Sequence, residues 1–196
     1  MSEFWLYFKL GLEHVLDWLA YDHILFIVVL VAAYSFKSWK RVLWLVSIFT
    51  LGHTLSLFLA VYDLVRVTAV WVELLIALTI LFTAFYNILS AKKREHQRNS
   101  SILYVSTAFF GIIHGLGFSR YFNMIFPDSS NKFLPLMEFA LGIEAAQIIV
   151  VFSVLIISFI LQNILRVNRR DWILVISAIV IGILLPILKE TILSVW

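Results

Sequence analysis

The sequence predicts an all-α, polytopic membrane protein with about six transmembrane helices. Hydrophobic residues make up 62% of the 196 residues and charged residues only 14%, whereas soluble domains contain about 25% charged residues. The mean hydropathy is +0.98. Apolar stretches of roughly 20 residues, the length that a spanning helix needs, recur along the chain between short charged loops. These observations exclude an ordinary soluble domain.

Taken in order, the apolar stretches predict six spans within one domain, residues 1–196. They cover residues 18–36, 42–61, 70–90, 102–119, 136–161 and 172–188. Residues 4–17 precede them as an apolar, aromatic-rich lead-in with a few charges. Such a segment is typical of an interfacial helix or of an extension of the first span. The longest connection, 119–135, is rich in turn-forming residues.

Basic residues predict how the chain is oriented in the membrane. Three alternate loops hold ten of the fifteen lysines and arginines: Lys37, Lys40, Arg41, Lys92, Lys93, Arg94, Arg98, Arg166, Arg169 and Arg170. Because loops rich in lysine and arginine stay in the cytoplasm, both termini are expected outside. The charges near the N-terminus do not follow the pattern of a cleavable signal peptide, so none is expected there.

A short internal similarity suggests two halves, 1–95 and 96–196. Residues 50–61 read TLGHTLSLFLAV and residues 140–151 read ALGIEAAQIIVV, with Leu-Gly and an apolar tail at matching positions. Thirty residues separate His23 from His53, and thirty separate His114 from Glu144. Three helices per half would make the halves run inverted to each other, which is a common plan in transporters. Chance agreement is the alternative, because the match is short.

Ionisable side chains inside the predicted spans indicate where function resides, because each costs about 2.5–3.5 kcal/mol at mid-membrane unless it is paired or hydrated. These residues are Asp22, His23, His53, Glu73, His114, Glu138 and Glu144. In the predicted topology Asp22, His23, His53, His114, Glu138 and Glu144 come from four helices and all fall in the outer half of the membrane. The chain has no cysteine, so a metal site here would use imidazole and carboxylate ligands. Such ligands suit Ni, Zn, Fe, Co or Mn.

The histidines in the spans also have structural explanations. Asp22 and His23 fit the start of a helix, where Asp22 would cap the backbone. His53 can hydrogen-bond to a neighbouring helix. His114 stands in the run GIIHGLGF, whose glycines favour close helix packing and would bring the imidazole to a neighbouring helix. A site role is the preferred interpretation for each, because burial without one is costly.

The carboxylates divide in the same way. Glu144 shares a helix face with Gln147, and a lone buried carboxylate is costly, so Glu144 is a candidate ligand or base. Glu138 and Glu73 lie nearer the predicted membrane surface, where an interfacial position explains them equally well. His14, on the lead-in segment, is a further candidate for the site.

Four runs of the chain carry a family resemblance. They are LGLEHVLDWLAYDHILFIV, FTLGHTLSL, FFGIIHGLGFS and FALGIEAAQ, and the runs at 22–26 and 114–118 are the most specific parts. Together they resemble the HupE/UreJ family of hydrogenase and urease accessory membrane proteins, in the expected order over nearly the whole chain. The resemblance implies a bacterial inner-membrane protein whose ion is nickel or a similar divalent metal. It also implies functional roles for His14, Asp22, His23, His114 and Glu144.

One spacing departs from that family's pattern. The family's first histidine is usually separated from Asp-His by five residues, whereas seven residues separate His14 from Asp22 here. Nine positions along a regular helix place His14 and His23 on opposite faces. Either the helix breaks between them, or His14 is not a ligand.

Two functions fit these residues. The first is a divalent metal-ion permease, with nickel implied by the resemblance and zinc, iron or cobalt compatible with the ligands. Few polar residues continue into the inner half; they are Ser47, Thr79, Thr83 and Asn87. The second is a membrane-embedded metallohydrolase that opens outward, with Glu144 or Asp22 as the base that activates a metal-bound water. A metal sensor or assembly partner is a third interpretation. The expected partners are membrane lipids and the metal ion, with no nucleic acid.

Overall fold

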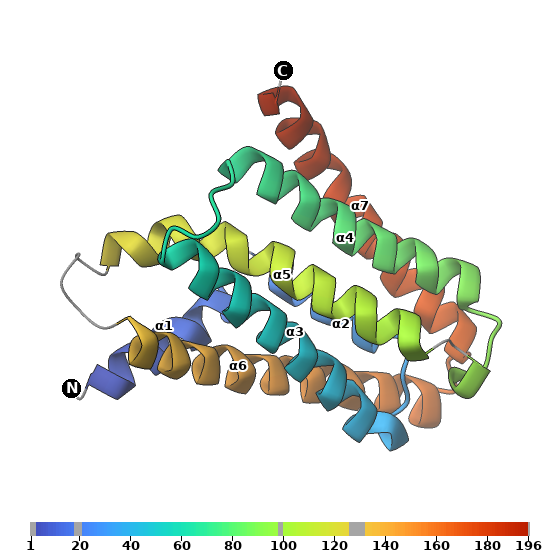
Figure 1. Cartoon of the computed structure of the whole chain (residues 1–196). Coiled ribbons are helices and arrows are strands. Elements are labelled where there is room, and N and C mark those ends of the chain that lie inside the picture. The colour runs from blue at the N-terminus through green and yellow to red at the C-terminus, as the bar shows by residue number, and fades with distance from the viewer. Residues whose placement is uncertain (1–2, 18–20, 98–99, 126–131, 196) are drawn as a thin grey trace.

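The computed structural model describes residues 3–17, 21–97, 100–125 and 132–195, which contain helices and no strand (Figure 1). The α-helices are α1 (Glu3–Leu16), α2 (Asp22–Val31), α3 (Trp39–Val61), α4 (Ala69–Ser90), α5 (Ser100–Ile125), α6 (Phe133–Phe159) and α7 (Arg169–Val195). The connections include the 3₁₀ helices η1 (Phe36–Ser38) and η2 (Glu95–Gln97), and α6 ends in a π-helical turn, η3 (Ile160–Ile164). The prediction of an all-α protein is confirmed.

Five of the helices are long and apolar enough to cross a membrane. They cover Phe36–Val61, Ala69–Ser90, Ser101–Ser119, Phe133–Ile164 and Arg169–Ser194, and they coincide with the five spans predicted between residues 42 and 188. Their outward faces expose large apolar side chains, among them Trp44, Leu89 and Val105. Only lipid solvates such a surface favourably, because in water it would be a large exposed apolar patch. The chain is therefore a multi-pass membrane protein.

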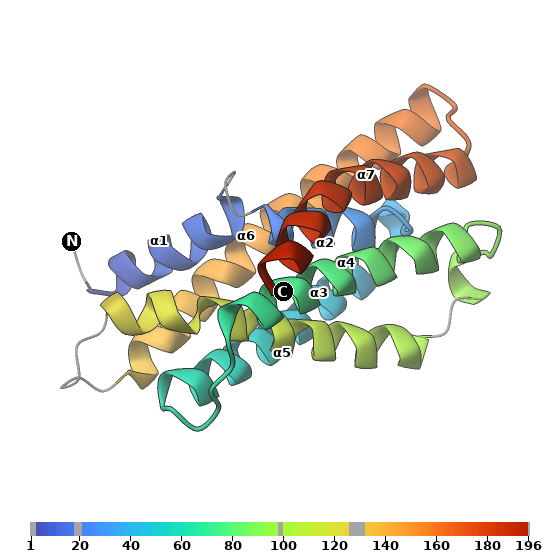
Figure 2. The same cartoon turned by 90° about the horizontal axis from the view of Figure 1, so that it is seen from above.

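The beginning of the chain differs from the prediction of one long span over 18–36. Residues 18–20 lie outside the described residues, and α2 has ten residues, about 15 Å of helix against a hydrocarbon core of about 30 Å. The segment before it, α1, packs along α6 within the bundle. Figures 1 and 2 show α1 and α2 following each other along the bundle. The expected lead-in and first span are therefore two short helices separated by a break.

Glycines bring α3 and α5 into backbone contact. A Cβ atom at Gly111 would collide with the carbonyl of Phe49, and one at Gly115 would collide with the carbonyl of His53. A Cβ at Gly52 would lie 2.5 Å from the carbonyl oxygen of Ala108. Small residues allow helix axes to approach this closely in membranes, where packing replaces the hydrophobic effect as the force between helices.

The contact between α1 and α6 repeats the contact between α3 and α5. A Cβ at Gly11 would collide with the carbonyl of Phe139, and one at Gly142 would collide with the carbonyl of Phe8. Each α3 residue of the first contact has its counterpart 90 residues later, in α6. Each α5 residue has its counterpart 100 residues earlier, in α1. The offset of 90 residues between 50–61 and 140–151 in the sequence is therefore also the offset between the contacting residues of α3 and α6. However, His114 corresponds to His14, each three residues after its glycine, and not to His23 as the spacings of thirty residues suggested.

The three basic loops meet at one end of the bundle. Arg169, at the start of α7, donates side-chain hydrogen bonds to the carbonyls of Ala33 (2.8 Å) and Lys93 (3.2 Å). Ser35 donates its backbone N–H and its hydroxyl to the carboxylate of Glu95, at 3.2 and 3.1 Å. These bonds join the connections that follow α2, α4 and α6, which Figure 1 shows together. This end of the bundle is called the basic end below.

We expect Gly111→Ala to lower the thermal midpoint of the detergent-solubilised protein, because the added Cβ meets the Phe49 carbonyl and forces α3 from α5. Overpacking of this kind costs about 1–3 kcal/mol. Gly182→Ala is the matched control, since nothing lies within 4 Å of a Cβ at that helical position and alanine favours a helix over glycine. A midpoint for Gly111→Ala equal to that of the wild type would contradict the close contact.

Candidate metal centre

The break between α1 and α2 places His14 beside His23. Helix α1 ends at Leu16 and α2 begins at Asp22, and the two imidazole rings lie 4.7 Å apart between centroids. In an unbroken helix the same residues would be about 13.5 Å apart along the axis and on opposite faces. The sequence left two alternatives, a helix break or a His14 outside the site, and the structure shows the break.

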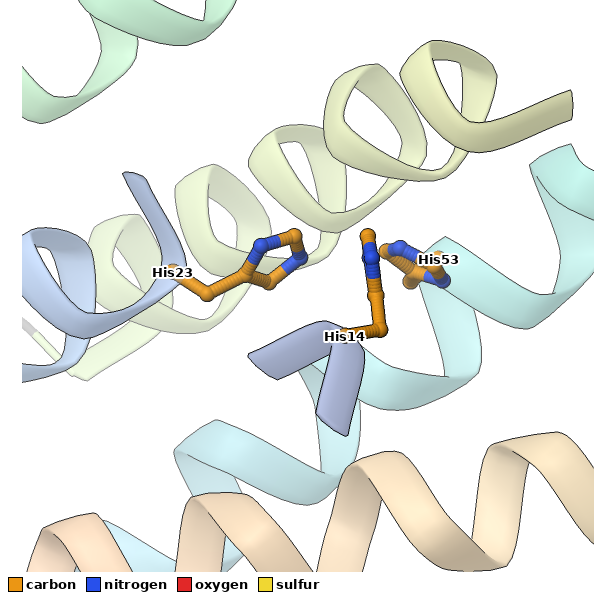
Figure 3. A group of neighbouring side chains, drawn as sticks. All are labelled: His14, His23 and His53. Atoms are coloured by element: carbon orange, nitrogen blue, oxygen red, sulfur yellow. The ribbon is translucent and has the colours of Figure 1, made fainter. Parts of the chain in front are cut away.

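Two further histidines reach the same point from α3 and α5. The ring of His53 lies 5.7 Å from that of His14 and 5.5 Å from that of His23. The ring of His114 lies 5.2 Å from that of His23. Figure 3 shows the side chains of His14, His23 and His53 converging from three helices. These four histidines, together with Asp22, are called the histidine centre below.

The ligand atoms of the histidine centre form two overlapping groups. His14, His23 and His53 each offer one nitrogen, and these nitrogens lie within 4.8 Å of one another. Asp22, His23 and His114 form a second group by the same measure. Because His23 belongs to both groups, the four histidines and Asp22 form one continuous candidate site.

Hydrogen bonds select the tautomers of two of these imidazoles. His23 donates from its backbone N–H and from Nδ1 to Asp22 Oδ1, at 2.8 and 3.1 Å. The Thr79 hydroxyl donates to the carbonyl of Ile76 and lies 3.3 Å from His114 Nε2, from which it accepts. The lone pairs that remain are on Nε2 of His23 and Nδ1 of His114. A second partner that fixes the ring in this way is the usual arrangement around metal-binding histidines.

Five imidazole nitrogens of the centre are buried and have no hydrogen-bond partner within the described part of the chain. They are Nε2 of His14, Nε2 of His23, Nδ1 and Nε2 of His53, and Nδ1 of His114. Buried polar atoms without partners are costly, and most native structures avoid them. A divalent ion held by imidazole and carboxylate would satisfy them, and the absence of cysteine from the sequence favours metals that accept nitrogen and oxygen ligands.

Two layers of phenylalanine rings enclose the imidazoles. The layer toward the basic end comes from α2, α3 and α5, about one helical turn from the histidine on the same helix, and consists of Phe26, Phe49 and Phe110. Its nearest ring, that of Phe49, lies 5.0 Å from the ring of His114. The layer on the opposite side consists of Phe118, Phe122 and Phe139, with Phe118 only 4.0 Å from the ring of His14. Such apolar walls strengthen electrostatic interactions inside the centre.

An acidic cavity of about 850 Å³ connects the histidine centre to the outside of the bundle. It lies among α1, α2, α4 and α5 and contains His14, His23 and His114 in its wall. Four carboxylates also line it: Glu13, Asp17, Asp22 and Glu73. No lysine or arginine appears among its described lining residues. Several acidic groups over low-dielectric walls attract cations toward the cavity.

Glu144, a ligand expected from the sequence, lies outside both groups. Helix α6 begins at Phe133, three residues earlier than predicted, so Glu144 lies eleven residues into the helix, about 17 Å from its start. At this depth its carboxylate accepts a hydrogen bond of 2.5 Å from the Ser47 hydroxyl of α3. Glu144 thus contacts α3 and lies outside both groups, and its role as a ligand or base stays a prediction. Glu138 is buried nearer the start of α6 and also belongs to neither group.

Two features of the site were not predicted from the sequence. Thr79 was considered only as a polar residue of the inner half, whereas its hydroxyl contacts His114. Glu13 was not considered, although it lines the cavity together with Glu73. The available signal was the spacing of Glu13, in the last turn of α1, and Asp17, which lies four residues later and just beyond the end of that helix.

The fold and the site define a class of protein: a multi-pass α-helical membrane protein with a buried cluster of histidines and a carboxylate suited to a divalent metal ion. Residues 1–188 match the model of the HupE / UreJ protein family, and the chain belongs to that family. Membership supports a metal-related function at the membrane, in a family that relates to nickel and cobalt handling. Comparisons with curated proteins and with solved structures gave no significant match.

We expect Asp22→Ala to weaken Ni²⁺ binding by about 10- to 100-fold, because it removes the acceptor that orients His23. Asp17→Ala is the matched control, since it removes the same charge from the same cavity but belongs to neither ligand group. Equilibrium dialysis of the detergent-purified variants with ⁶³Ni²⁺ measures both affinities. Equal losses in the two variants would mean that Asp22 acts only through its charge.

Proposed function

We propose that this protein is a divalent metal-ion permease of the bacterial inner membrane, with nickel or cobalt as its preferred ion. The observation that carries the proposal is the histidine centre itself. Four imidazoles meet inside a bundle of apolar helices, five of their nitrogens lack partners in the described residues, and an acidic cavity leads to them. A purely structural polar network would satisfy its own hydrogen bonds.

The broken N-terminal segment supports transport. Helices α1 and α2 contain 14 and 10 residues, about 36 Å of helix in total, enough for one crossing of the hydrocarbon core. We take them together as one discontinuous crossing, which restores the count of six. Transporters typically place ion sites at such broken helices, near the middle of the membrane.

The proposed direction is inward. The basic end would face the cytoplasm by the rule for lysine and arginine, with both termini on the periplasmic side. His53 lies eight residues from the outer end of α3 at Val61, about 12 Å, so the centre would sit in the outer half of the membrane. The acidic cavity would then collect the ion from the periplasm, and the layer of Phe26, Phe49 and Phe110 would close the path inward until the protein changes conformation.

A membrane metallohydrolase that opens to the periplasm is the second candidate. The phenylalanine layer favours it, because a closed floor suits a site that is used from one side only. Asp22 would then be the base that activates a metal-bound water. Glu144, the other candidate base, is bonded to Ser47 and belongs to neither ligand group.

Uptake of ⁶³Ni²⁺ into proteoliposomes tests the permease. We expect the wild type to accumulate the ion, and both His23→Ala and His114→Ala to retain less than about a tenth of the rate, because each removes a ligand of the centre. Gly182→Ala provides a control variant with no change near the site. A wild type that binds Ni²⁺ tightly but transports none would reject the permease and leave the hydrolase.

The acidic cavity makes uptake sensitive to its charges. We expect Glu73→Gln to raise the Ni²⁺ concentration for half-maximal uptake by about two- to five-fold, because it removes one negative charge from the cation's path. The effect should shrink at high salt, where screening acts over a few ångströms. Glu190→Gln, at an exposed position on α7 that does not line the cavity, is the charge-matched control. Equal behaviour of the two variants at low salt would contradict a role for the cavity.

A further inference from the structure

Four polar side chains of α3 and α6 gather on the inner side of the histidine centre. The Ser47 hydroxyl donates to Glu144 at 2.5 Å, and the Thr50 hydroxyl donates to the side-chain carbonyl of Gln147 at 2.9 Å. Helices α3 and α6 run in opposite directions (Figure 1), so the two hydrogen bonds cross and bring the four side chains to one level. These residues are called the inner polar cluster below.

The inner polar cluster lies between the histidine centre and the basic end. On α3, Thr50 and Ser47 precede His53 by three and six residues, roughly 5 and 9 Å toward the basic end. On α6, Glu144 and Gln147 follow Phe139 by five and eight residues, roughly 8 and 12 Å in the same direction. Phe139 belongs to the phenylalanine layer on the other side of the centre, and its ring lies 5.6 Å from that of His14. The two sites are thus successive along the bundle.

Some polar atoms of the cluster remain available as ligands for a cation. Glu144 is half-buried, and in the described residues no basic side chain forms an ion pair with it. An unpaired carboxylate at this depth is costly, and such residues within a membrane typically mark ion pathways. Gln147 is fully buried, and its Nε2 has no partner among the described residues. Carboxylate, amide and hydroxyl oxygens together make a harder and weaker ligand set for nickel than imidazoles do.

The other polar residues of the inner half donate hydrogen bonds to backbone carbonyls. Thr79 and Thr83 donate to backbone carbonyls of their own helix, and Asn87 donates to the carbonyl of Val29. None of the three carries a charge. The α4 side chains therefore use their hydrogen bonds within the bundle, whereas the inner polar cluster has a carboxylate that can bind a cation.

We propose that Ser47, Thr50, Glu144 and Gln147 form a second, weaker cation station, which receives the ion from the histidine centre on its way to the basic end. This inference rests on the proposed permease. A strong site followed by a weaker one suits transport, because an ion must be able to leave each site that it enters. It also gives Glu144 a role at the position where the structure shows it, away from the histidines.

The test is the stoichiometry of Ni²⁺ binding and the rate of uptake in the full-length chain. We expect the wild type to bind one ion tightly and a second at least about tenfold more weakly, consistent with the two ligand sets. Glu144→Gln should lose the weak ion, keep the tight one and slow ⁶³Ni²⁺ uptake by about tenfold. His114→Ala should lose the tight ion and keep the weak one. Glu138→Gln, a buried carboxylate earlier on α6, is the matched control and should resemble the wild type.

Retention of the tight ion by Glu144→Gln shows that the variant is folded. Should that variant not fold, Ser47→Ala, which removes only a hydroxyl, is expected to weaken the second ion in the same direction. A wild type that binds a single ion, or a Glu144→Gln variant whose isotherm matches that of Glu138→Gln, would overturn the station. If the wild type takes up no ion, the proposed permease function is rejected. The binding isotherms still decide whether the second binding site exists.

Discussion

Four imidazole rings from four helices meet in the interior of this bundle, and five of their nitrogens have no hydrogen-bond partner in the part of the chain that the structure describes. In a membrane no water is available to satisfy such atoms, so the cost must be met by a bound ion or by water from the acidic cavity. His14 can meet His23 only because one helix ends at Leu16 and the next begins at Asp22. The break is the constraint on which the geometry of the site depends.

The packing around the centre follows from this requirement. Glycines let α3 approach α5 and let α1 approach α6, which brings His53, His114 and His14 within reach of His23. The same contacts occur in both helix pairs with constant shifts along the sequence. The α3–α5 and α1–α6 contacts thus share one geometry, and α1, the helix before the break, belongs to the second of them. The layer of Phe26, Phe49 and Phe110 then separates the site from the basic end, and the cavity leaves access to it.

The five long spans were predictable because each is a run of apolar residues bounded by charged loops. The break was not, because residues 4–36 are apolar throughout most of their length and no proline stands between His14 and Asp22. Only the unusual spacing of His14 from Asp22 indicated it. Four helices carry the predicted histidines to one place because each histidine lies at a similar depth. The neighbours of Glu144 could not be predicted, because sequence alone does not tell which neighbour a helix face meets.

Cysteine cross-linking tests the helix break most directly, since the natural chain has no cysteine. In the double variant His14→Cys and His23→Cys, a short bifunctional methanethiosulfonate reagent should bridge the two thiols, so that intact mass spectrometry without reductant finds one linker per chain and no remaining methanethiosulfonate group. The rings they replace lie 4.7 Å apart. Each single variant should carry one linker that is attached at one end and keeps its second methanethiosulfonate group. If the double variant instead carries two linkers, each attached at one end, residues 14 and 23 are not adjacent, and the histidine centre does not exist in the form described.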